Sequence, residues 1–230
     1  GAPIRIAAGM GNLAREGCTY YGIVLRPGLD VARPPGRMRI RAGQDGASRF
    51  VVTRMLAQGH VNLKGVEMIR LPEAVIATSL ESGAIDAAAV SEPALSRFAR
   101  IGSRWLAAQE AAPDFQWGVL AFGERLRIRE RDTGVRFLRA YFRGVAQYRQ
   151  GKTARNVAII AERTGETTEM MREACWPTFS ADSRINWESI EAFQSWAKSE
   201  GLMERAVSRE QAWDSMFVAA SADRKPAAVP

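Results

Sequence analysis

The stretch that decides the fold is Ser82-Gly83-Ala84-Ile85-Asp86-Ala87-Ala88-Ala89-Val90-Ser91-Glu92-Pro93. Its segment Ile85–Val90 is short and nearly continuously apolar, which is typical of a strand buried on both faces of a parallel sheet. The preceding segment Glu73–Glu81 has apolar residues at helical spacing, and Gly83 stands where a helix C-cap belongs. Pro93 suits the first turn of a following helix, Pro93–Arg100. The stretch therefore predicts a helix–strand–helix unit of an α/β fold.

Glu92 directly follows the predicted strand. In open α/β sheets, ligands bind outside the carboxyl ends of the strands. Glu92 is therefore predicted to lie at a ligand-binding edge, where its carboxylate could pair with an ammonium group or accept hydrogen bonds from a polar ligand. The alternative is an ordinary solvated carboxylate.

Outward from this stretch, strand and helix patterns alternate. They predict a parallel sheet with helices on both faces, formed by residues 38–113. The expected strands there are Met38–Ala42, Glu67–Leu71, Ile85–Val90 and Trp105–Gln109, and the expected helices are Arg49–Gln58, Glu73–Glu81 and Pro93–Arg100.

The rest of the chain is expected to form a second lobe, from residues 1–37 and 114–230. Its predicted strands are Ile4–Ala8, Thr19–Leu25 and Gln116–Phe122, and its predicted helices are Gly134–Arg149, Ala154–Arg163, Thr167–Trp176, Trp187–Ser199 and Arg209–Val218. The loop from Leu29 to Arg37, which contains Pro34-Pro35-Gly36, marks the expected boundary between the lobes.

Composition narrows the function classes. The net charge of +7 comes almost entirely from arginines that are scattered beside Glu and Asp. No basic run is interleaved with aromatic residues as a nucleic-acid groove would require, so nucleic-acid binding is not expected. No apolar run approaches the ~20 residues of a membrane span, and no signal peptide is visible. Because the chain opens directly into the strand pattern of Ile4–Ala8, we expect that a segment upstream is missing.

The turn Gly43–Ser48 leads from a predicted strand into a helix. The first-turn amides of a helix are unpaired and carry partial positive charge, so Gly46, Ala47 and Ser48 are candidates for holding an anionic group. An ordinary N-cap and turn is the equally weighted alternative. The turn is not a P-loop, because no Gly-Lys-Ser/Thr ends it.

Aromatic residues occur near the two strands that could cross between lobes. Tyr20, Tyr21, Gln116 and Trp117 are candidates for lining a ligand cleft, although single aromatics more often belong to a core.

Residues for catalysis are scarce. His60 is the only histidine, and no nucleophile elbow or zinc-binding motif is present, so neither an enzyme nor a metal site is predicted. Cys18 and Cys175 are far apart in sequence and could be buried thiols or a disulfide, so cysteine usage does not decide the compartment.

Several segments resemble one family in the same order along the chain. Leu80–Pro93 is similar to the "Gly-x-Val/Ile-Asp-Ala … Glu-Pro" stretch of the nitrate/sulfonate/taurine-type solute-binding proteins of ABC importers. Phe137–Gly144 resembles their "Phe-Leu-x-Ala-Tyr-x-x-Gly" helix, and Trp213–Val218 resembles their C-terminal "Asp-x-Ser-Phe-Val". Gly1–Ile6 is similar to their "Gly-x-Pro-Val-x-Ile" strand. The broader grouping includes binders of thiamine-pyrimidine precursors.

The resemblance implies a two-lobed α/β periplasmic-binding fold of type II, with ligand in the cleft between lobes and Tyr20–Leu25 and Gln116–Phe122 as hinge strands. The oxyanion site would fall on Gly46, Ala47 and Ser48, and the family's Glu-Pro on Glu92 and Pro93. It also implies a periplasmic or extracytoplasmic location and an ABC permease as partner, with no cofactor. In the family a substantial part of the first lobe precedes the strand that Ile4–Ala8 resembles. We therefore expect either a fragment or a lobe that another copy or partner completes.

The function expected from these observations is non-enzymatic capture of a small polar, anionic solute. Two alternatives stay open. One is a pyrimidine synthase related to thiamine biosynthesis, for which this chain lacks the Cys-rich stretch and active-site histidines. The other is the effector-sensing domain of a transcription regulator, which would need a helix-turn-helix upstream. The identity of the solute stays open among nitrate, sulfonates, taurine, carboxylates and pyrimidines.

Overall fold

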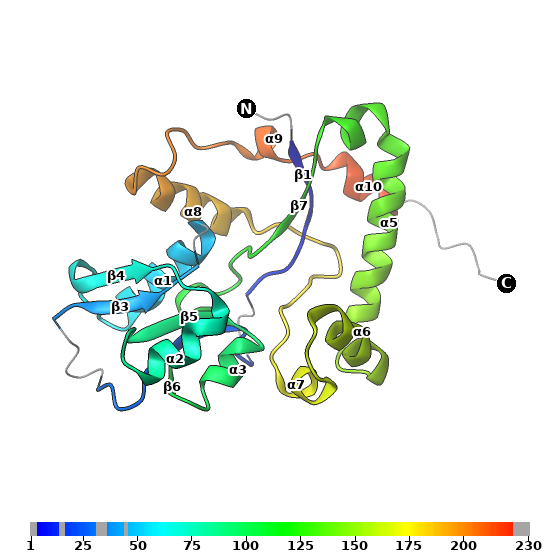
Figure 1. The fold of residues 1–230 in the computed structure, drawn as a ribbon. Helices are drawn as coiled ribbons and strands as arrows, with labels where there is room; N and C mark the ends of the chain where they lie inside the picture. The colour runs from blue at the N-terminus through cyan, green and yellow to red at the C-terminus, as the bar shows by residue number, and fades with distance from the viewer. Residues whose placement is uncertain (1–3, 14–16, 31–35, 44–45, 223–230) are drawn as a thin grey trace. The chain divides into compact units, whose positions relative to one another are not determined.

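The structure is a computed structural model that describes residues 4–13, 17–30, 36–43 and 46–222. Its contacts divide the chain into two compact units (Figure 1). The first unit comprises Gly1–Asn12, Gln116–Arg163 and Thr178–Pro230, and the second comprises Leu13–Phe115 and Thr164–Pro177.

The second unit is built on a five-stranded sheet with the strand order β4-β3-β5-β2-β6. The strands are β2 (Tyr21–Leu25), β3 (Met38–Arg41), β4 (Val66–Ile69), β5 (Ala87–Ser91) and β6 (Ser103–Ala107). The strand β3 pairs in parallel with β4 and β5, whereas β2 pairs antiparallel with β5 and β6. The sheet is therefore mixed.

The strand β2 corrects one expectation, because its antiparallel pairing makes the sheet mixed rather than all parallel. The segment Tyr20–Leu25, expected as a hinge strand, contributes an interior strand of this sheet, and its hinge role stays a prediction. All five residues of β2 are buried. Burial on both faces gives the same apolar run whether a strand is parallel or antiparallel, so the pattern reveals neither its direction nor its neighbours.

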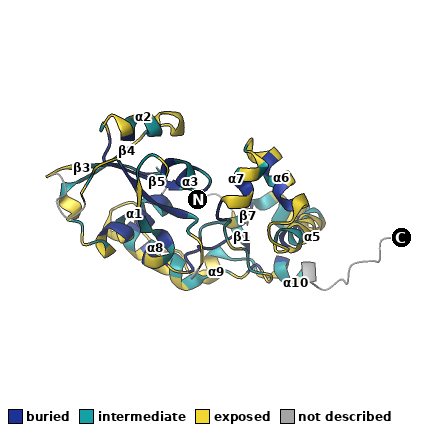
Figure 2. Ribbon diagram, turned by 90° about the horizontal axis from the view of Figure 1, so that it is seen from below, coloured by how far each residue is buried: buried dark blue, intermediate teal, exposed yellow. Residues whose placement is uncertain are grey.

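Helices cover both faces of this sheet. On one face, α2 (Ile76–Glu81) and α3 (Ala94–Phe98) pack on a core that includes Leu80, Val90 and Leu95. The helix α1 (Gly46–Gln58) lies on the opposite face (Figure 2) and buries Phe50, Val51, Met55 and Leu56. The remaining helical segments are η1 (Leu63–Gly65), η2 (Glu73–Val75), α4 (Ala108–Ala111) and α7 (Thr168–Glu173).

Several predicted boundaries change in detail. The helix α1 begins at Gly46 rather than Arg49, so the candidate anion-binding residues form its first turn. The strand expected over Trp105–Gln109 ends at Ala107 and is followed at once by α4. Gly83 has a φ of 70°, which confirms its predicted place beyond the helix end.

The first unit contains a two-stranded antiparallel sheet of β1 (Arg5–Gly9) and β7 (Val119–Phe122). Ala7, Ala8, Phe122, Leu138 and Phe217 form its core. Its helices are η3 (Arg125–Arg129), α5 (Arg131–Tyr148), α6 (Ala154–Thr164), α8 (Trp187–Ser199), α9 (Arg209–Ala212) and α10 (Met216–Ala222).

The helix expected over Arg209–Val218 is two helices. Trp213 bridges to Ile6 of β1, and the amide of Asp214 donates to the Ile6 carbonyl at 2.9 Å. This pairing with a strand takes the backbone out of the helical conformation between α9 and α10. The helix α8, in contrast, has the predicted bounds.

The units differ from the lobes expected over residues 1–37 with 114–230 and over 38–113. The strand β2 and the segment Thr164–Pro177 lie in the second unit with the mixed sheet. A disulfide joins Cys18 to Cys175 within this unit, which resolves the two alternatives left open for these cysteines. That the chain works as two lobes stays a prediction. Among the described residues, no helix is both long and apolar enough to cross a membrane.

Candidate functional site

The carboxyl edge of the second unit's sheet gathers six of the eight predicted ligand residues. The parallel strands β3 and β5 end at this edge, and the antiparallel β2 begins there, with Tyr21 paired to Ser91. The helix α1 starts a few residues after β3 ends. Tyr20, Tyr21, Glu92 and the first turn of α1 therefore stand at one edge, where ligands of open α/β sheets bind.

The start of α1 holds the three residues predicted to bind an anion, and this role stays a prediction. The helix is 13 residues long, so its first-turn amides carry the full partial positive charge of a helix N-terminus. Gly46 and Ala47 are half-buried, and Ser48 is buried at 6% exposure. Because Gly46 and Ala47 are small, a ligand atom can approach their backbone closely.

The Glu92 carboxylate is held by partners of its own. Its side chain is only 3% exposed and accepts hydrogen bonds from the Ser96 amide at 3.0 Å and the Ser96 hydroxyl at 2.8 Å. The Arg104 guanidinium lies 3.7 Å from the same carboxylate. A ligand role for Glu92 requires that it share these partners, and this role stays a prediction.

Tyr20 supplies a phenol beside this carboxylate. Burial is the main cause that raises the pKa of Tyr20, the Glu92 charge raises it further, and a hydrogen bond with Ser91 lowers it. The phenol is therefore protonated at neutral pH and able to donate a hydrogen bond. The neighbouring Tyr21 is buried at 4% exposure.

The other two predicted residues lie in the first unit. Gln116 is buried, and its amide nitrogen donates to the Gly118 carbonyl at 2.7 Å and the Gly11 carbonyl at 3.2 Å, while its side-chain oxygen accepts from the Asn186 amide. Gln116 thus joins three backbone segments of its own unit. Trp117 is half-buried. A ligand role for either residue stays a prediction.

Sequence reasoning missed one residue at the carboxyl edge, Arg41. It is the last residue of β3, and its side chain donates from Nε to the Leu71 carbonyl at 3.2 Å and from Nη1 to the Ala89 carbonyl at 3.0 Å. The signal was a charged residue next to the end of the predicted strand Met38–Ala42, just before the turn Gly43–Ser48.

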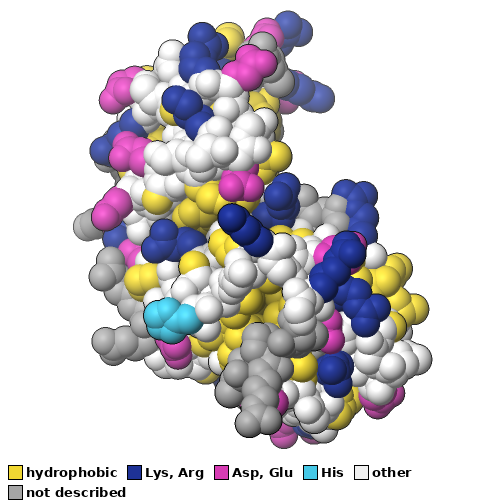
Figure 3. All heavy atoms as spheres, turned by 90° about the vertical axis from the view of Figure 1, so that its left-hand side faces the viewer, with side chains coloured by type: hydrophobic (Ala, Val, Ile, Leu, Met, Phe, Trp, Pro, Cys, Tyr) yellow, Lys and Arg dark blue, Asp and Glu magenta, His cyan; other side chains and the backbone are white. Residues whose placement is uncertain are grey.

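Other chemistry is sparse. Within the described ranges, no group of three His, Cys, Asp or Glu side chains could hold a metal ion. His60 is exposed at the surface (Figure 3). A pocket of about 440 Å³ lies between α1 and α4, and none of the eight predicted residues lines it; the lining residues are Arg54, Ala57, Gln58, Glu110 and Ala111.

Comparison with solved structures identifies the fold. A zinc-bound ligand-binding component of an ABC-type import system from Staphylococcus aureus matches with a TM-score of 0.78 at 13% identity, over 95% of this chain and 74% of that chain. The periplasmic aliphatic sulphonate binding protein SsuA from Escherichia coli matches with a TM-score of 0.68 at 15% identity, over 94% and 75%. A mutant of DSZB, a desulfurization enzyme, in complex with biphenyl-2-sulfinic acid matches with a TM-score of 0.67 at 14% identity, over 97% and 80%.

These matches show that the chain has the α/β fold of periplasmic binding proteins, as the sequence resemblance implied. No protein-family model and no curated protein sequence matches it. The same fold carries both binding proteins and an enzyme in the matched structures, so the fold alone does not define the activity.

Proposed function

We propose that this protein is the solute-binding component of an ABC importer and that it captures a small anionic solute of the sulfonate, nitrate or taurine type. The observation that carries the proposal is the carboxyl edge of the second unit's sheet. The start of α1, Tyr20 and Arg41 all lie at this edge and offer positive charge or hydrogen-bond donors, and the fold is shared with import-system binding components, which supports the proposal.

At this edge, the amides of Gly46, Ala47 and Ser48 would bind the anionic oxygens, and the Ser48 and Tyr20 hydroxyls would add donors. Glu92 would accept a hydrogen bond from a donor group of the solute, and Tyr21 would contribute to the wall. A ligand role for Gln116 and Trp117, which lie in the first unit, stays a prediction. An ABC permease would then take up the solute. No nucleic acid or cofactor is required.

The disulfide between Cys18 and Cys175 supports an extracytoplasmic location, because such bonds persist in oxidising compartments. The residues present favour binding over catalysis. Both thiols are joined in the disulfide, and the only histidine, His60, is exposed. A nucleophile or general base would have to come from another residue type.

A thermal-shift panel on the chain tests the proposal. It contains taurine, alkanesulfonates, nitrate, bicarbonate, aromatic carboxylates and aminopyrimidines. A ligand at one hundred times its Kd adds about 2.7 kcal/mol to the free energy of unfolding and raises Tm by a few degrees. A shift with the sulfonates, taurine or nitrate alone is expected. A shift with aminopyrimidines alone would favour a thiamine-precursor protein, and no shift with any compound would contradict the proposal.

A further inference from the structure

In the part of the chain that the structure describes, no ion pair joins Arg41 to a carboxylate, whereas several other arginines of the second unit are paired. Arg26 and Arg39 pair with Asp86, Arg97 pairs with Glu73 and Glu166, and Arg104 pairs with Glu92. Arg41 contacts only two backbone carbonyls in the part of the chain that the structure describes. The positive charge of Arg41 is therefore available to attract an anion.

That place is the carboxyl edge of the sheet. Arg41 ends β3 and pairs across the strands with Ile69 and Ala88. Its two acceptors belong to Leu71, just beyond the end of β4, and to Ala89, near the end of β5. The guanidinium thus bridges the ends of two parallel strands on either side of its own.

These two hydrogen bonds fix the guanidinium without using all its donors. A guanidinium has five N–H groups, and the bonds from Nε and Nη1 use two of them. The half-buried side chain limits competition from water. A held arginine with free N–H groups is suited to an anion with planar or forked oxygens, because it can donate two parallel hydrogen bonds.

We propose that Arg41 determines the specificity of the site. Because of Arg41, the site selects an anionic head group over a neutral group of the same shape. This inference rests on the proposed function, since it concerns the charge of the solute bound at that edge. Arg41 contributes a fixed charge that does not depend on the first turn of α1.

Isothermal titration calorimetry with ethanesulfonate and its neutral isostere ethanesulfonamide tests the inference. The wild-type chain should bind the sulfonate more tightly. In Arg41→Met, which keeps an unbranched apolar stem and removes the guanidinium and its charge, affinity for the sulfonate should fall about tenfold or more, and affinity for the sulfonamide should stay within about twofold. The matched control is Arg70→Met, since Arg70 is exposed beside the end of β4 and its loss changes the net charge equally.

Arg41→Lys keeps the charge and loses the forked donors, so it should keep the preference for the sulfonate at reduced affinity. If circular dichroism shows that Arg41→Met does not fold, the test rests on Arg41→Lys. Loss of the preference for ethanesulfonate over ethanesulfonamide in Arg41→Lys would then overturn the inference. Unchanged sulfonate binding by Arg41→Met, or an equal loss in Arg70→Met, overturns it while leaving the proposed function in place. Binding of neither compound by the wild-type chain, together with a flat thermal-shift panel, would overturn the proposed function itself.

Discussion

At the scale of single residues, Asp86 is the buried carboxylate that connects the fold-deciding stretch to its neighbours. Its side chain is 7% exposed and accepts from the Arg39 amide at 2.8 Å and from Arg26 Nε at 3.2 Å. Its backbone bonds to the same two residues, because its amide donates to the Arg39 carbonyl and its carbonyl accepts from the Arg26 amide. Asp86 thus ties the start of β3 and the end of β2 to the start of β5.

Replacing Asp86 by Asn should lower the free energy of unfolding by about 2–3 kcal/mol, because its NH₂ group would face one of two donors, the Arg39 amide or Arg26 Nε, and the ion pairs would be lost. Urea denaturation measures this loss. The control is Glu67→Gln, which breaks the exposed pair with Arg37 and should cost at most about 1 kcal/mol. Equal losses in the two variants would contradict a special role for Asp86.

The phenol of Tyr141 should make the free energy of unfolding depend on pH in the alkaline range. Its hydroxyl donates to the Gly9 carbonyl at 3.0 Å, and burial raises the pKa of Tyr141 above the ordinary 10.0. The folded state therefore holds the phenolic proton more tightly than the unfolded state. This contribution to stability is complete below pH 10 and is lost as the pH rises through the folded-state pKa.

Tyr141→Phe should be less stable than the wild type at pH 8 by about 1 kcal/mol, because the hydrogen bond is lost. The difference should shrink between pH 10 and pH 12. Denaturation curves recorded across this range measure both effects. A constant difference across the range would contradict the raised pKa.

At the scale of elements, α5 contains two glycines in opposite surroundings. A Cβ on Gly134 would lie 2.9 Å from the Phe217 ring and 2.9 Å from the Leu126 carbonyl oxygen. A Cβ on Gly144 would meet open space. The first glycine lets α5 pack closely on α10 and η3, whereas the second only weakens the helix.

Gly134→Ala should therefore destabilise the protein by about 1–3 kcal/mol through overpacking. Gly144→Ala should stabilise it by up to about 1 kcal/mol through helix propensity. Thermal unfolding of the two variants measures the changes. Shifts of Tm in the same direction would contradict the packing of α5 described above.

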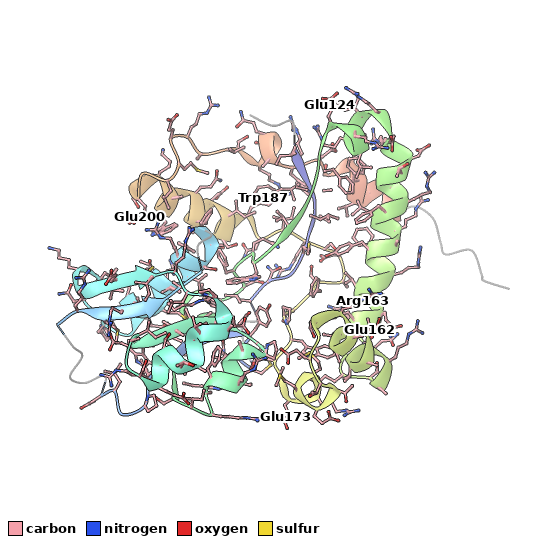
Figure 4. The ribbon with its side chains drawn as sticks, in the orientation of Figure 1. Glu124, Glu162, Arg163, Glu173, Trp187 and Glu200 are labelled. Atoms are coloured by element: carbon pink, nitrogen blue, oxygen red, sulfur yellow. A yellow bond between two sulfur atoms is a disulfide. The ribbon has the colours of Figure 1, made fainter. Side chains whose placement is uncertain are left out.

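The segment Thr164–Pro177 is held in the second unit by one covalent and two ionic links. Cys175 bonds to Cys18, Arg97 pairs with Glu166 at 2.6 Å, and Arg100 pairs with Glu173 at 3.2 Å. Glu173 lies on α7 (Figure 4). The Arg100–Glu173 pair is exposed, and exposed ion pairs add little to the free energy of unfolding. The disulfide is therefore expected to contribute most to holding this segment in place.

The double variant Cys18→Ala/Cys175→Ala should lose about 2–5 kcal/mol of unfolding free energy and become more sensitive to proteolysis within 164–177. Reduction of the wild type by dithiothreitol should cause a similar loss, while the double variant should not respond to the reductant. An unchanged Tm after complete reduction, verified by mass spectrometry, would show that the link does not stabilise the unit.

The elements also show what the sequence could predict. The bounds of α8 and most of α5 follow from helical periodicity, and the edge position of Glu92 follows from the strand–turn–helix pattern around it. The antiparallel direction of β2 could not be predicted, because its partners β5 and β6 are distant in sequence and its apolar run suits either direction. The burial of the Glu92 and Gln116 side chains among their own partners also depends on contacts that no local pattern encodes.

At the scale of the whole molecule, the proposed function is solute capture, and the proposed site lies at the carboxyl edge of the second unit's sheet. Ligand binding should therefore stabilise one defined part of the chain rather than all of it equally. The eight predicted ligand residues fall in both units. The amides that the ligand protects from exchange therefore also indicate which of these residues bind it.

Hydrogen–deuterium exchange with and without saturating ethanesulfonate tests this claim most directly. Slower exchange is predicted in the first turns of α1, at Tyr20 and Tyr21, and around Ser91 and Glu92, with exchange in the core of the first unit around Leu138 unchanged. Unchanged exchange throughout the chain, or protection confined to residues away from the carboxyl edge of the second unit's sheet, would contradict the account.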